Sequence, residues 1–420
     1  MNISSRPVGE WEVTLVTSAA RAPLYVRIVQ AVVADIRRGR LVPGQRLPGS
    51  RTLAARLGVH RNTVLSAYAE LEAEGWIATD PARHTLVCET LPDALPPARR
   101  AAATALGFGL PRRARSVGPD DPWQGLMLSD GTPDPQLVPR AALARAYRRV
   151  LRDKDPTLLG YGDPRGHERL RAALAGMLSA TRGLSLDAAG VLVTRGSQMA
   201  LDLVARVLLE PGDVVAVEAL GYRPAWEALA AHGAALVPVG IDGEGLRVDE
   251  LAALAQRTRL KALYVTPHHQ YPTTATLSAA RRLALLELAR KRRFAIIEDD
   301  YDHEFHYNGR PVLPLASADS AGVVVYVGTL SKVLAPSLRL GYLVAPHEVL
   351  ARCLSERRHL DRQGDAVVEC AVAELIEDGE LQRHARRMRR VYQARREALV
   401  ASLERSLPGR LVALPASGGM

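Results

Sequence analysis

The chain has 420 residues, of which 47% are apolar, so it is long enough for two or three domains with substantial cores. Its formal net charge of +10 is compatible with nucleic-acid binding, but arginines spread along the whole chain produce this charge, which makes it a weak indicator. No uninterrupted run of about twenty apolar residues occurs, which predicts a protein without a membrane span or a targeting segment. Three widely spaced cysteines, Cys88, Cys353 and Cys370, follow no metal-ligand pattern and predict a cytoplasmic location.

Residues 20–90 carry three short helical patterns followed by a strand-like segment. In the first pattern apolar side chains recur four apart, and this helix is expected to end at Gly39. Ser50 and Gly58 mark the start and the end of a second helix, and Gly75 closes a third. The following run, "WIATDPARHTLVCETL", predicts two short strands around a turn. Three helices and a small hairpin indicate a winged helix-turn-helix domain.

The rest of the chain divides into a linker and a second domain. Residues 91–124 are rich in Pro, Arg, Ala and Gly without sustained periodicity, which predicts a linker. In residues 125–420, helical stretches alternate with the apolar runs "GVLVTR", "DVVAVE", "AALVPV", "ALYVTP", "FAIIEDD" and "GVVVYVG". This alternation predicts an α/β domain with a mostly parallel sheet that is covered on both faces. Ligands of such sheets bind at the carboxyl ends of the strands.

Lysine is scarce in this chain, which has four lysines and fifty-one arginines. Lys332 directly follows one of the apolar runs, in "GTLSKVLAPSLRLG". Arginine stays charged at any working pH, whereas a lysine amine that loses its proton can attack a carbonyl carbon. Lys332 is therefore either an ordinary exposed lysine at a strand end or the covalent partner of an aldehyde.

Other strand ends carry polar residues that suit a small ligand. A turn through Gly196, Ser197 and Gln198 opens a helix directly after a strand, which suits a phosphate, although a plain helix cap has the same pattern. The run "FAIIEDDYDHEF" ends a buried strand with clustered carboxylates, which need a cationic partner. A metal ion is the competing partner, but His303 and His306 show no convincing ligand spacing, so we expect no metal site.

Together these features indicate pyridoxal 5'-phosphate (PLP) as the ligand. Its aldehyde would bond Lys332, and one of the carboxylates would pair with its ring nitrogen. Tyr301 would donate a hydrogen bond to the ring oxygen, and Tyr222 offers a flat face for the ring. Arg339 is a second cation that can hold the phosphate.

The sequence resembles a known family over nearly its whole length. Residues 20–90 resemble a GntR-type winged helix, and residues 125–420 resemble a fold-type I aminotransferase. The stretches that carry the second resemblance include "GYGDPRGHERLRAAL", "YVTPHHQYPT", "IIEDDYDHEF" and "YVGTLSKVLAPSLRLGYLVAP". In this order, the two parts resemble the MocR family of transcriptional regulators. The resemblance implies a homodimer that binds double-stranded DNA and PLP.

The resemblance also implies roles for the matching residues around the PLP ring. Lys332 would form the aldimine, the Schiff base with PLP, and Asp299 would pair with the pyridinium nitrogen. Tyr301 would donate a hydrogen bond to the ring hydroxyl, and Tyr222 would lie over the ring.

Further roles follow from the same resemblance. His269 or Gln270 would approach the ring oxygen, with both alternatives open. Tyr161 would reach the phosphate in a partner subunit. The residues implied to hold the phosphate are Gly196, Ser197, Gln198, Thr329, Ser331 and Arg339.

In the winged helix, the stretch "HRNTVLSAY" is expected to enter the major groove at its amino-terminal end. The preceding helix would contact the backbone or a base through its first turn, and the wing would reach a minor groove. The predicted DNA contacts are Arg51, Arg61, Asn62, Thr63, Arg83 and His84.

Two features depart from the family pattern. Relatives usually continue well beyond "LPASGGM", so the small domain at the carboxyl end is expected to be incomplete and to lack an arginine that grips a substrate carboxylate. The final stretch, "ELQRHARRMRRVYQARREALVASLERSLPGRLVAL", predicts one long basic helix followed by a strand. Relatives also commonly have a glycine where this chain has Thr274.

Three functions remain open on the sequence. The first is a transcriptional regulator in which an amine or amino acid effector exchanges with Lys332. The second is a working PLP-dependent aminotransferase with a DNA-binding appendage, against which the missing carboxyl-terminal segment argues. The third is a regulator that senses PLP itself through occupancy of Lys332.

Overall fold

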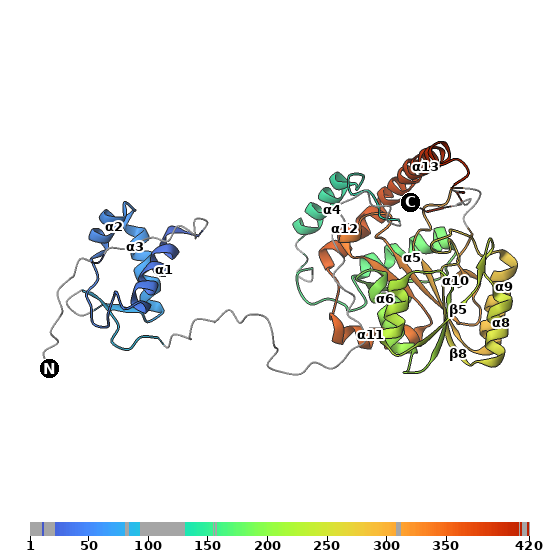
Figure 1. Ribbon diagram of the computed structural model, residues 1–420, viewed down its shortest axis with the longest axis horizontal. Coiled ribbons are helices and arrows are strands. Elements are labelled where there is room, and N and C mark those ends of the chain that lie inside the picture. Colours follow the sequence, from blue (N-terminus) through green and yellow to red (C-terminus); the bar gives the residue numbers. More distant parts are fainter. Residues whose placement is uncertain are drawn as a thin grey trace. The chain divides into compact units, whose positions relative to one another are not determined.

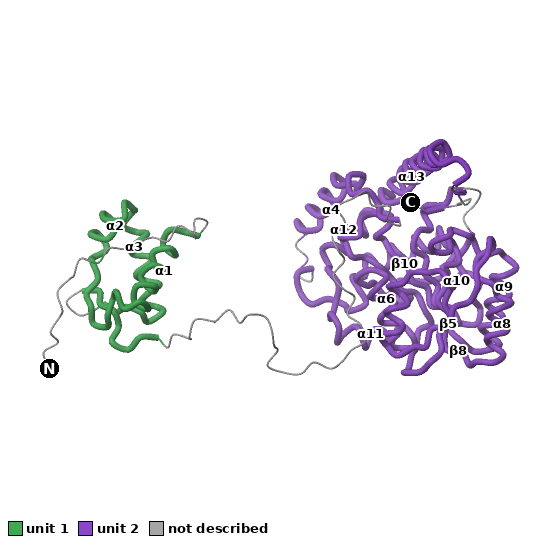
Figure 2. Tube along the Cα trace, in the orientation of Figure 1, with its two compact units in different colours: residues 1–121 green, residues 122–420 purple. Residues whose placement is uncertain are grey.

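The computed structural model describes residues 11, 22–79, 84–92, 131–153, 155, 158–307, 312–410, 412–413 and 418–419. The chain divides into two compact units, residues 1–121 and 122–420 (Figures 1 and 2). The linker predicted at 91–124 lies outside the described residues except for its first two. None of the described helices is long and apolar enough to cross a membrane.

The smaller unit contains three helices and a two-stranded hairpin. Its elements are α1 (Leu24–Arg37), α2 (Ser50–Leu57), α3 (Arg61–Ala73), β1 (Ile77–Thr79) and β2 (Thr85–Val87). Gly58 ends α2 at φ 64°, a left-handed conformation that residues with a Cβ adopt only at a cost. The helices and the hairpin share a core that includes Ile28, Val32, Leu71 and Val87. The prediction of a winged helix-turn-helix is confirmed.

The larger unit is built on a seven-stranded sheet with the order β3-β11-β10-β9-β8-β4-β5. The strands are β3 (Leu192–Thr194), β4 (Val214–Glu218), β5 (Ala235–Val239), β8 (Leu260–Val265), β9 (Ala295–Asp300), β10 (Val324–Thr329) and β11 (Gly341–Val344). Strand β11 was not predicted, and it runs antiparallel to both β3 and β10. The other neighbouring strands are parallel, so the prediction of a mostly parallel sheet is confirmed.

Helices surround this sheet. They are α4 (Arg140–Arg152), α5 (Glu168–Arg182), α6 (Ser197–Leu208), α7 (Arg223–Ala231), α8 (Val248–Arg257), α9 (Ala279–Arg292), α10 (Leu315–Ala318), α11 (His347–Leu360), α12 (Ala366–Glu377) and α13 (Glu380–Ser406). A small hairpin, β6 (Ile241–Asp242) and β7 (Gly245–Leu246), precedes α8. The long basic helix predicted near the carboxyl end is α13, whose Met388 and Tyr392 pack against Phe305.

Side chains of the central strands alternate between two faces of the sheet, and different helices cover each face (Figure 1). In β8, Tyr264 faces the core formed with α6, α7 and α11, whereas Val265 faces the core formed with α8 and α9. Ile297 of β9 lies in the same core as Tyr264. By the same alternation, Asp299 belongs to the face of Tyr264 and Asp300 to the opposite face.

Candidate functional site

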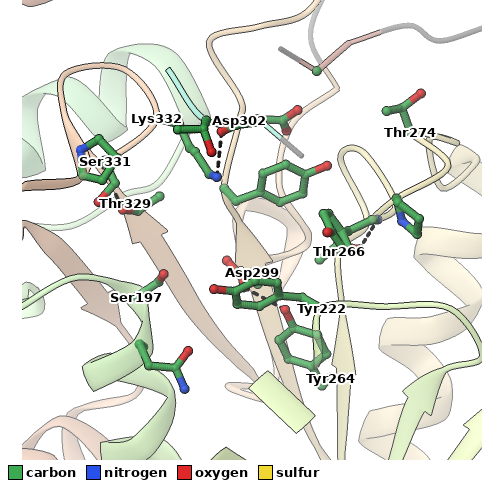
Figure 3. A pocket seen from close by; sticks show the side chains of 18 of the residues that line it. Ser197, Tyr222, Tyr264, Thr266, Thr274, Asp299, Asp302, Thr329, Ser331 and Lys332 are labelled. Carbon is green, nitrogen blue, oxygen red and sulfur yellow. Dashed lines mark hydrogen bonds between the residues drawn. The ribbon is translucent and has the colours of Figure 1, made fainter. Parts of the chain in front are cut away.

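A cavity of about 520 Å³ lies at the carboxyl ends of the central strands. Lys332 follows β10, Asp299 lies near the end of β9, and Ser197 opens α6 after β3. Figure 3 shows these side chains around one space. They converge because the carboxyl ends of parallel strands share one edge of a sheet. The residues predicted to bind PLP that line this cavity are Ser197, Gln198, Tyr222, Asp299, Tyr301, Thr329, Ser331, Lys332 and Arg339.

The amine of Lys332 is partly buried in the wall of this cavity. Its Nζ donates a hydrogen bond to the carbonyl oxygen of Gly131 at 2.8 Å. Gly131 also lines the cavity, so the amine and its acceptor belong to the same site. The alternative of an ordinary exposed lysine does not describe this position.

Asp299 is 4% exposed and presents its two carboxylate oxygens to different surroundings. Its Oδ2 accepts a hydrogen bond of 2.8 Å from the hydroxyl of Tyr264. Its Oδ1 is buried and has no hydrogen-bond partner among the described residues. Burial raises the pKa of Asp299 to about 6, although Tyr264 and the charge of Lys332 act in the opposite direction. The carboxylate therefore lacks a donor, which a protonated ring nitrogen could provide.

At the other end of the cavity, the chain brings a helix amino terminus and a guanidinium group together. Gly196 precedes α6 with φ 81°, and a Cβ at this position would lie 3.2 Å from a guanidinium nitrogen of Arg339. Glycine is favoured here by the left-handed backbone conformation, and a Cβ would crowd the guanidinium of Arg339. Arg339 donates a hydrogen bond of 2.8 Å to the carbonyl oxygen of Arg195. This combination of backbone N–H groups and a fixed cation suits an anion.

Four of the predicted PLP contacts lie outside the cavity wall. Gly196 is not a lining residue, but a Cβ on it would contact Arg339, which lines the cavity. His269 is fully buried, and its Nδ1 lies 2.9 Å from a carboxylate oxygen of Asp302. The amide nitrogen of Gln270 donates to the backbone carbonyl of Leu220 at 2.7 Å. Tyr161 is 81% exposed, and the guanidinium of Arg362 lies 4.1 Å from the centre of its ring.

Several residues of the cavity wall were not predicted. They are Gly131, Thr132, Tyr264, Thr266, Tyr271, Pro272, Thr274, Asp302, Pro336 and Gly419. Asp302 follows β9 and Thr266 follows β8. Their position just after a strand was the only feature of the sequence that could have indicated a place in the cavity wall. Tyr264 lies inside β8, and its role depends on the pairing of β8 with β9. Thr274 adopts φ 59°, which is costly for a β-branched residue and accounts for the glycine expected there.

In the smaller unit, the predicted DNA-binding side chains gather at the start of α3. Arg61 and Asn62 are exposed, and the Nε of Arg61 donates to the hydroxyl of Ser50 at 3.3 Å. His60 caps the helix, because its Nδ1 accepts a hydrogen bond from the backbone N–H of Asn62 at 3.2 Å. Arg51 is exposed in the first turn of α2.

The remaining predicted DNA contacts are less exposed or lie outside the described residues. Thr63 is half-buried in the first turn of α3. His84 is half-buried just before β2, at one side of the wing. Arg83 lies outside the described residues.

The residues around the cavity fit PLP. Lys332 provides an amine for the aldehyde, and Oδ1 of Asp299 provides an acceptor without a partner among the described residues. Tyr222 provides an aromatic ring in the wall, and Arg339 with the amino terminus of α6 suits the phosphate. Fold and site together define a PLP-dependent unit of the aminotransferase type, joined in one chain to a winged helix.

Comparison with known proteins agrees with this class. Residues 124–420 match the family model of aminotransferase class I and II, and residues 24–87 match that of bacterial regulatory proteins of the gntR family. The chain is 34% identical to the probable rhizopine catabolism regulatory protein MocR of Rhizobium meliloti, over 92% of this chain and 78% of that protein. It is 35% identical to the HTH-type transcriptional regulator TauR of Rhodobacter capsulatus, over 91% and 80%.

A solved structure supports the same assignment. The kynurenine aminotransferase of Pyrococcus horikoshii, in complex with PMP, superposes with a TM-score of 0.66 and 31% identity, over 70% of this chain and 74% of that chain. The chain thus belongs to the MocR-type family of GntR regulators, in which a DNA-binding winged helix is joined to an aminotransferase class I and II domain.

Proposed function

We propose that this protein regulates transcription by binding operator DNA through residues 20–90 and PLP through residues 125–420, with an amine, an amino acid or PLP itself as the effector. One observation supports the proposal most strongly. The amine of Lys332, the buried carboxylate of Asp299 and the anion-binding end of α6 line one cavity, in a chain that also has a DNA-binding fold.

The proposed contacts of the PLP ring follow from the cavity wall. When bound, PLP supplies an aldehyde carbon that can bond an amine nitrogen. Lys332 is the proposed attachment point, and Oδ1 of Asp299 would accept a hydrogen bond from the protonated ring nitrogen. Tyr264 holds the other oxygen of Asp299 and so fixes the plane of the carboxylate. Tyr222 and Tyr301 line the cavity, where Tyr222 would lie against the ring and Tyr301 would donate a hydrogen bond to the ring hydroxyl.

The phosphate is proposed to bind between the start of α6 and Arg339. Arg339 is itself held in a left-handed conformation at φ 53°, which aims its side chain at Gly196. Thr329 accepts the backbone N–H of Ser331 at 3.1 Å, which orders the turn beside this site. Tyr161, which is widely exposed, is proposed to complete the phosphate site of a partner subunit in a homodimer. Analytical ultracentrifugation of the full chain tests the dimer.

One contact offers a route from ligand to DNA-binding unit. The amine of Lys332 donates to the carbonyl oxygen of Gly131, and Gly131 lies near the start of the larger unit along the chain. An effector that changes the bonding of Lys332 changes this contact as well. The conformational change that follows is the proposed signal, because a ligand shifts an equilibrium only through contacts that differ between two states.

Gel-shift titration on DNA from upstream of the protein's own gene tests the proposal, with PLP and a panel of amines and amino acids as effectors. PLP or one of these amines is expected to change DNA affinity in the native chain. Lys332→Ala is expected to keep DNA binding and to lose this response. If protein that carries PLP binds DNA with the same affinity in the presence of every effector tested, the proposal that this site senses an effector is contradicted.

The DNA side has its own matched pair of variants. Arg61→Ala is expected to lose about 1–3 kcal/mol of DNA-binding free energy. Arg145→Ala removes the same charge from an exposed position of α4 and serves as the control. If both variants lose the same DNA-binding free energy, only net charge matters. Helix α3 is then not the recognition helix.

Catalysis is a second candidate function. It is favoured by the likeness of residues 124–420 to aminotransferases, including the Pyrococcus horikoshii enzyme at 31% identity. Steady formation of product from amino donors and 2-oxo acids, lost in Lys332→Ala, would establish it. If protein that carries PLP shows no turnover, yet its DNA affinity changes with an effector, only the regulatory function is supported.

A further inference from the structure

Four histidines gather in the loops that follow β8 and β9. His268 and His269 come three and four residues after the end of β8, and His303 and His306 come soon after β9. Strands β8 and β9 are parallel neighbours, so the loops at their carboxyl ends lie side by side. All four side chains are buried.

Three of these imidazoles have the spacing of metal ligands. In His268, His269 and His306, one ring nitrogen from each residue lies within 4.8 Å of the other two. Nε2 of His269 and Nδ1 of His306 are 3.4 Å apart. Two nitrogens that bind one tetrahedral ion at 2.0–2.1 Å are about 3.3–3.4 Å apart. The pair therefore already has the separation that a shared ion requires.

His268 supplies an independent observation. It is 4% exposed, and neither of its ring nitrogens has a hydrogen-bond partner among the described residues. Its ring is stacked on that of His303, with 4.5 Å between the centres. A buried polar group without a partner is costly, so this imidazole is expected to have a ligand. A hydrogen bond between His306 and His269 explains their spacing but leaves His268 unexplained.

The surroundings also match a metal site. Nδ1 of His269 lies 2.9 Å from a carboxylate oxygen of Asp302, which leaves Nε2 directed toward His306. A carboxylate on the far nitrogen is the usual support of a metal-binding histidine, because it fixes the tautomer and the ring orientation. A second cavity of about 310 Å³ reaches the cluster at His306 and the neighbouring His303.

We propose that His268, His269 and His306 bind one divalent transition-metal ion of the Zn²⁺ class. Neutral imidazoles are preferred ligands of such ions, and three of them leave a fourth coordination position for water. The ion lies beside the cofactor cavity, because Asp302 contacts His269 and also lines that cavity. The site is independent of the proposed function, because no PLP contact is needed to form it.

Metal binding to the tag-free full chain, stripped with a chelator, tests the proposal. Equilibrium dialysis is expected to show one Zn²⁺ per chain. Co²⁺ in its place is expected to give the intense visible absorption of a four-coordinate ion. His268→Gln and His306→Gln are each expected to weaken binding at least about tenfold. His347→Gln, at the exposed start of α11, is the control and is expected to bind as the native chain does.

The outcomes are decisive in either direction. A native chain that binds no Zn²⁺ at one per chain overturns the proposal without any substitution, so a variant that fails to fold does not affect this result. If His268→Gln and His306→Gln both bind Zn²⁺ as the native chain does, and circular dichroism shows that both are folded, the ion binds elsewhere. This result also overturns the proposal. DNA binding and PLP absorbance are measured separately, so failure of the metal site leaves the proposed function standing.

Discussion

The two faces of β9 use the same residue type in opposite ways. Asp299 faces the cofactor cavity, and burial raises its pKa to about 6. Burial acts in the same direction on its neighbour Asp300, but His303 and Arg182 outweigh it and hold the pKa of Asp300 well below its usual value. Oδ1 of each carboxylate lacks a hydrogen-bond partner among the described residues, but only Asp300 has cationic neighbours from the protein, Arg182 and His303, whereas Asp299 faces the space for a ligand. Adjacent aspartates thus differ because strand alternation gives them different neighbours.

The largest expected effect on the cavity side is that of Lys332→Ala. Because Lys332 is the one lysine among the described residues of the cavity wall, this variant is expected to lose covalent attachment of PLP completely. Borohydride reduction followed by mass spectrometry measures the attachment, and absorbance of the protonated imine follows it in solution. Lys291→Ala, at an exposed position of α9, is the control. If PLP still attaches covalently to Lys332→Ala, another amine of the protein forms the bond.

On the opposite face, Asp300→Asn is expected to destabilise the protein by about 3–5 kcal/mol, because it removes one partner of a buried charged group. The hydroxyl of Tyr326 donates to Asp300, and Nε of Arg182 lies 3.7 Å from its carboxylate. Urea denaturation of the PLP-free protein measures the change in the free energy of unfolding. A loss below about 1 kcal/mol would show that the two faces do not differ in this way.

Asp299→Asn is expected to have the opposite effect on the PLP-free protein. Folding raises the pKa of Asp299 from 3.8 to about 6, so the folded state binds more protons than the unfolded state between these values. Stability is therefore lost as pH rises through this window. The variant is expected to remove this loss and to gain up to about 3 kcal/mol at pH 8. It keeps an oxygen acceptor for Tyr264.

The same variant is expected to bind PLP more weakly, since an amide lacks the charge that pairs with a ring nitrogen. Denaturation curves at pH 5 and pH 8, together with PLP titration, measure both effects. If the variant is more stable but binds PLP with unchanged affinity, Asp299 does not pair with the ring nitrogen. The contrast between Asp299 and Asp300 would then be weaker.

The smallest expected effect concerns the backbone of the cavity wall. Thr274 is held at φ 59°, and its N–H donates to the carbonyl of Gln270 at 2.6 Å. Thr274→Gly is expected to relieve the left-handed strain and to stabilise the protein by about 1 kcal/mol. Thermal denaturation measures the shift, with Thr273→Gly as the neighbouring control. Destabilisation by Thr274→Gly would show that side-chain contacts of Thr274 outweigh the strain.

Much of the fold could be predicted because its signals are local. Helix ends such as Gly58 and the buried runs of the sheet depend on residues close together in sequence. Strand β11 escaped prediction because its four residues form a short apolar run that a loop could equally contain. Several cavity residues near strand ends, such as Asp299 and Lys332, could be named for the same local reason, whereas Tyr264, inside β8, could not.

The sequence by itself determined the two folds, the lysine that follows β10 and the carboxylates at the end of β9, since each depends on the order of residues along one segment. Only the tertiary structure shows why Asp299, which the family resemblance implied, faces the cavity while Asp300 does not, and which histidines meet. The expectation of no metal site considered His303 and His306 along the chain alone, whereas the pairing of β8 with β9 adds His268 and His269. Contacts between neighbouring strands depend on sheet order and register, which no single segment specifies.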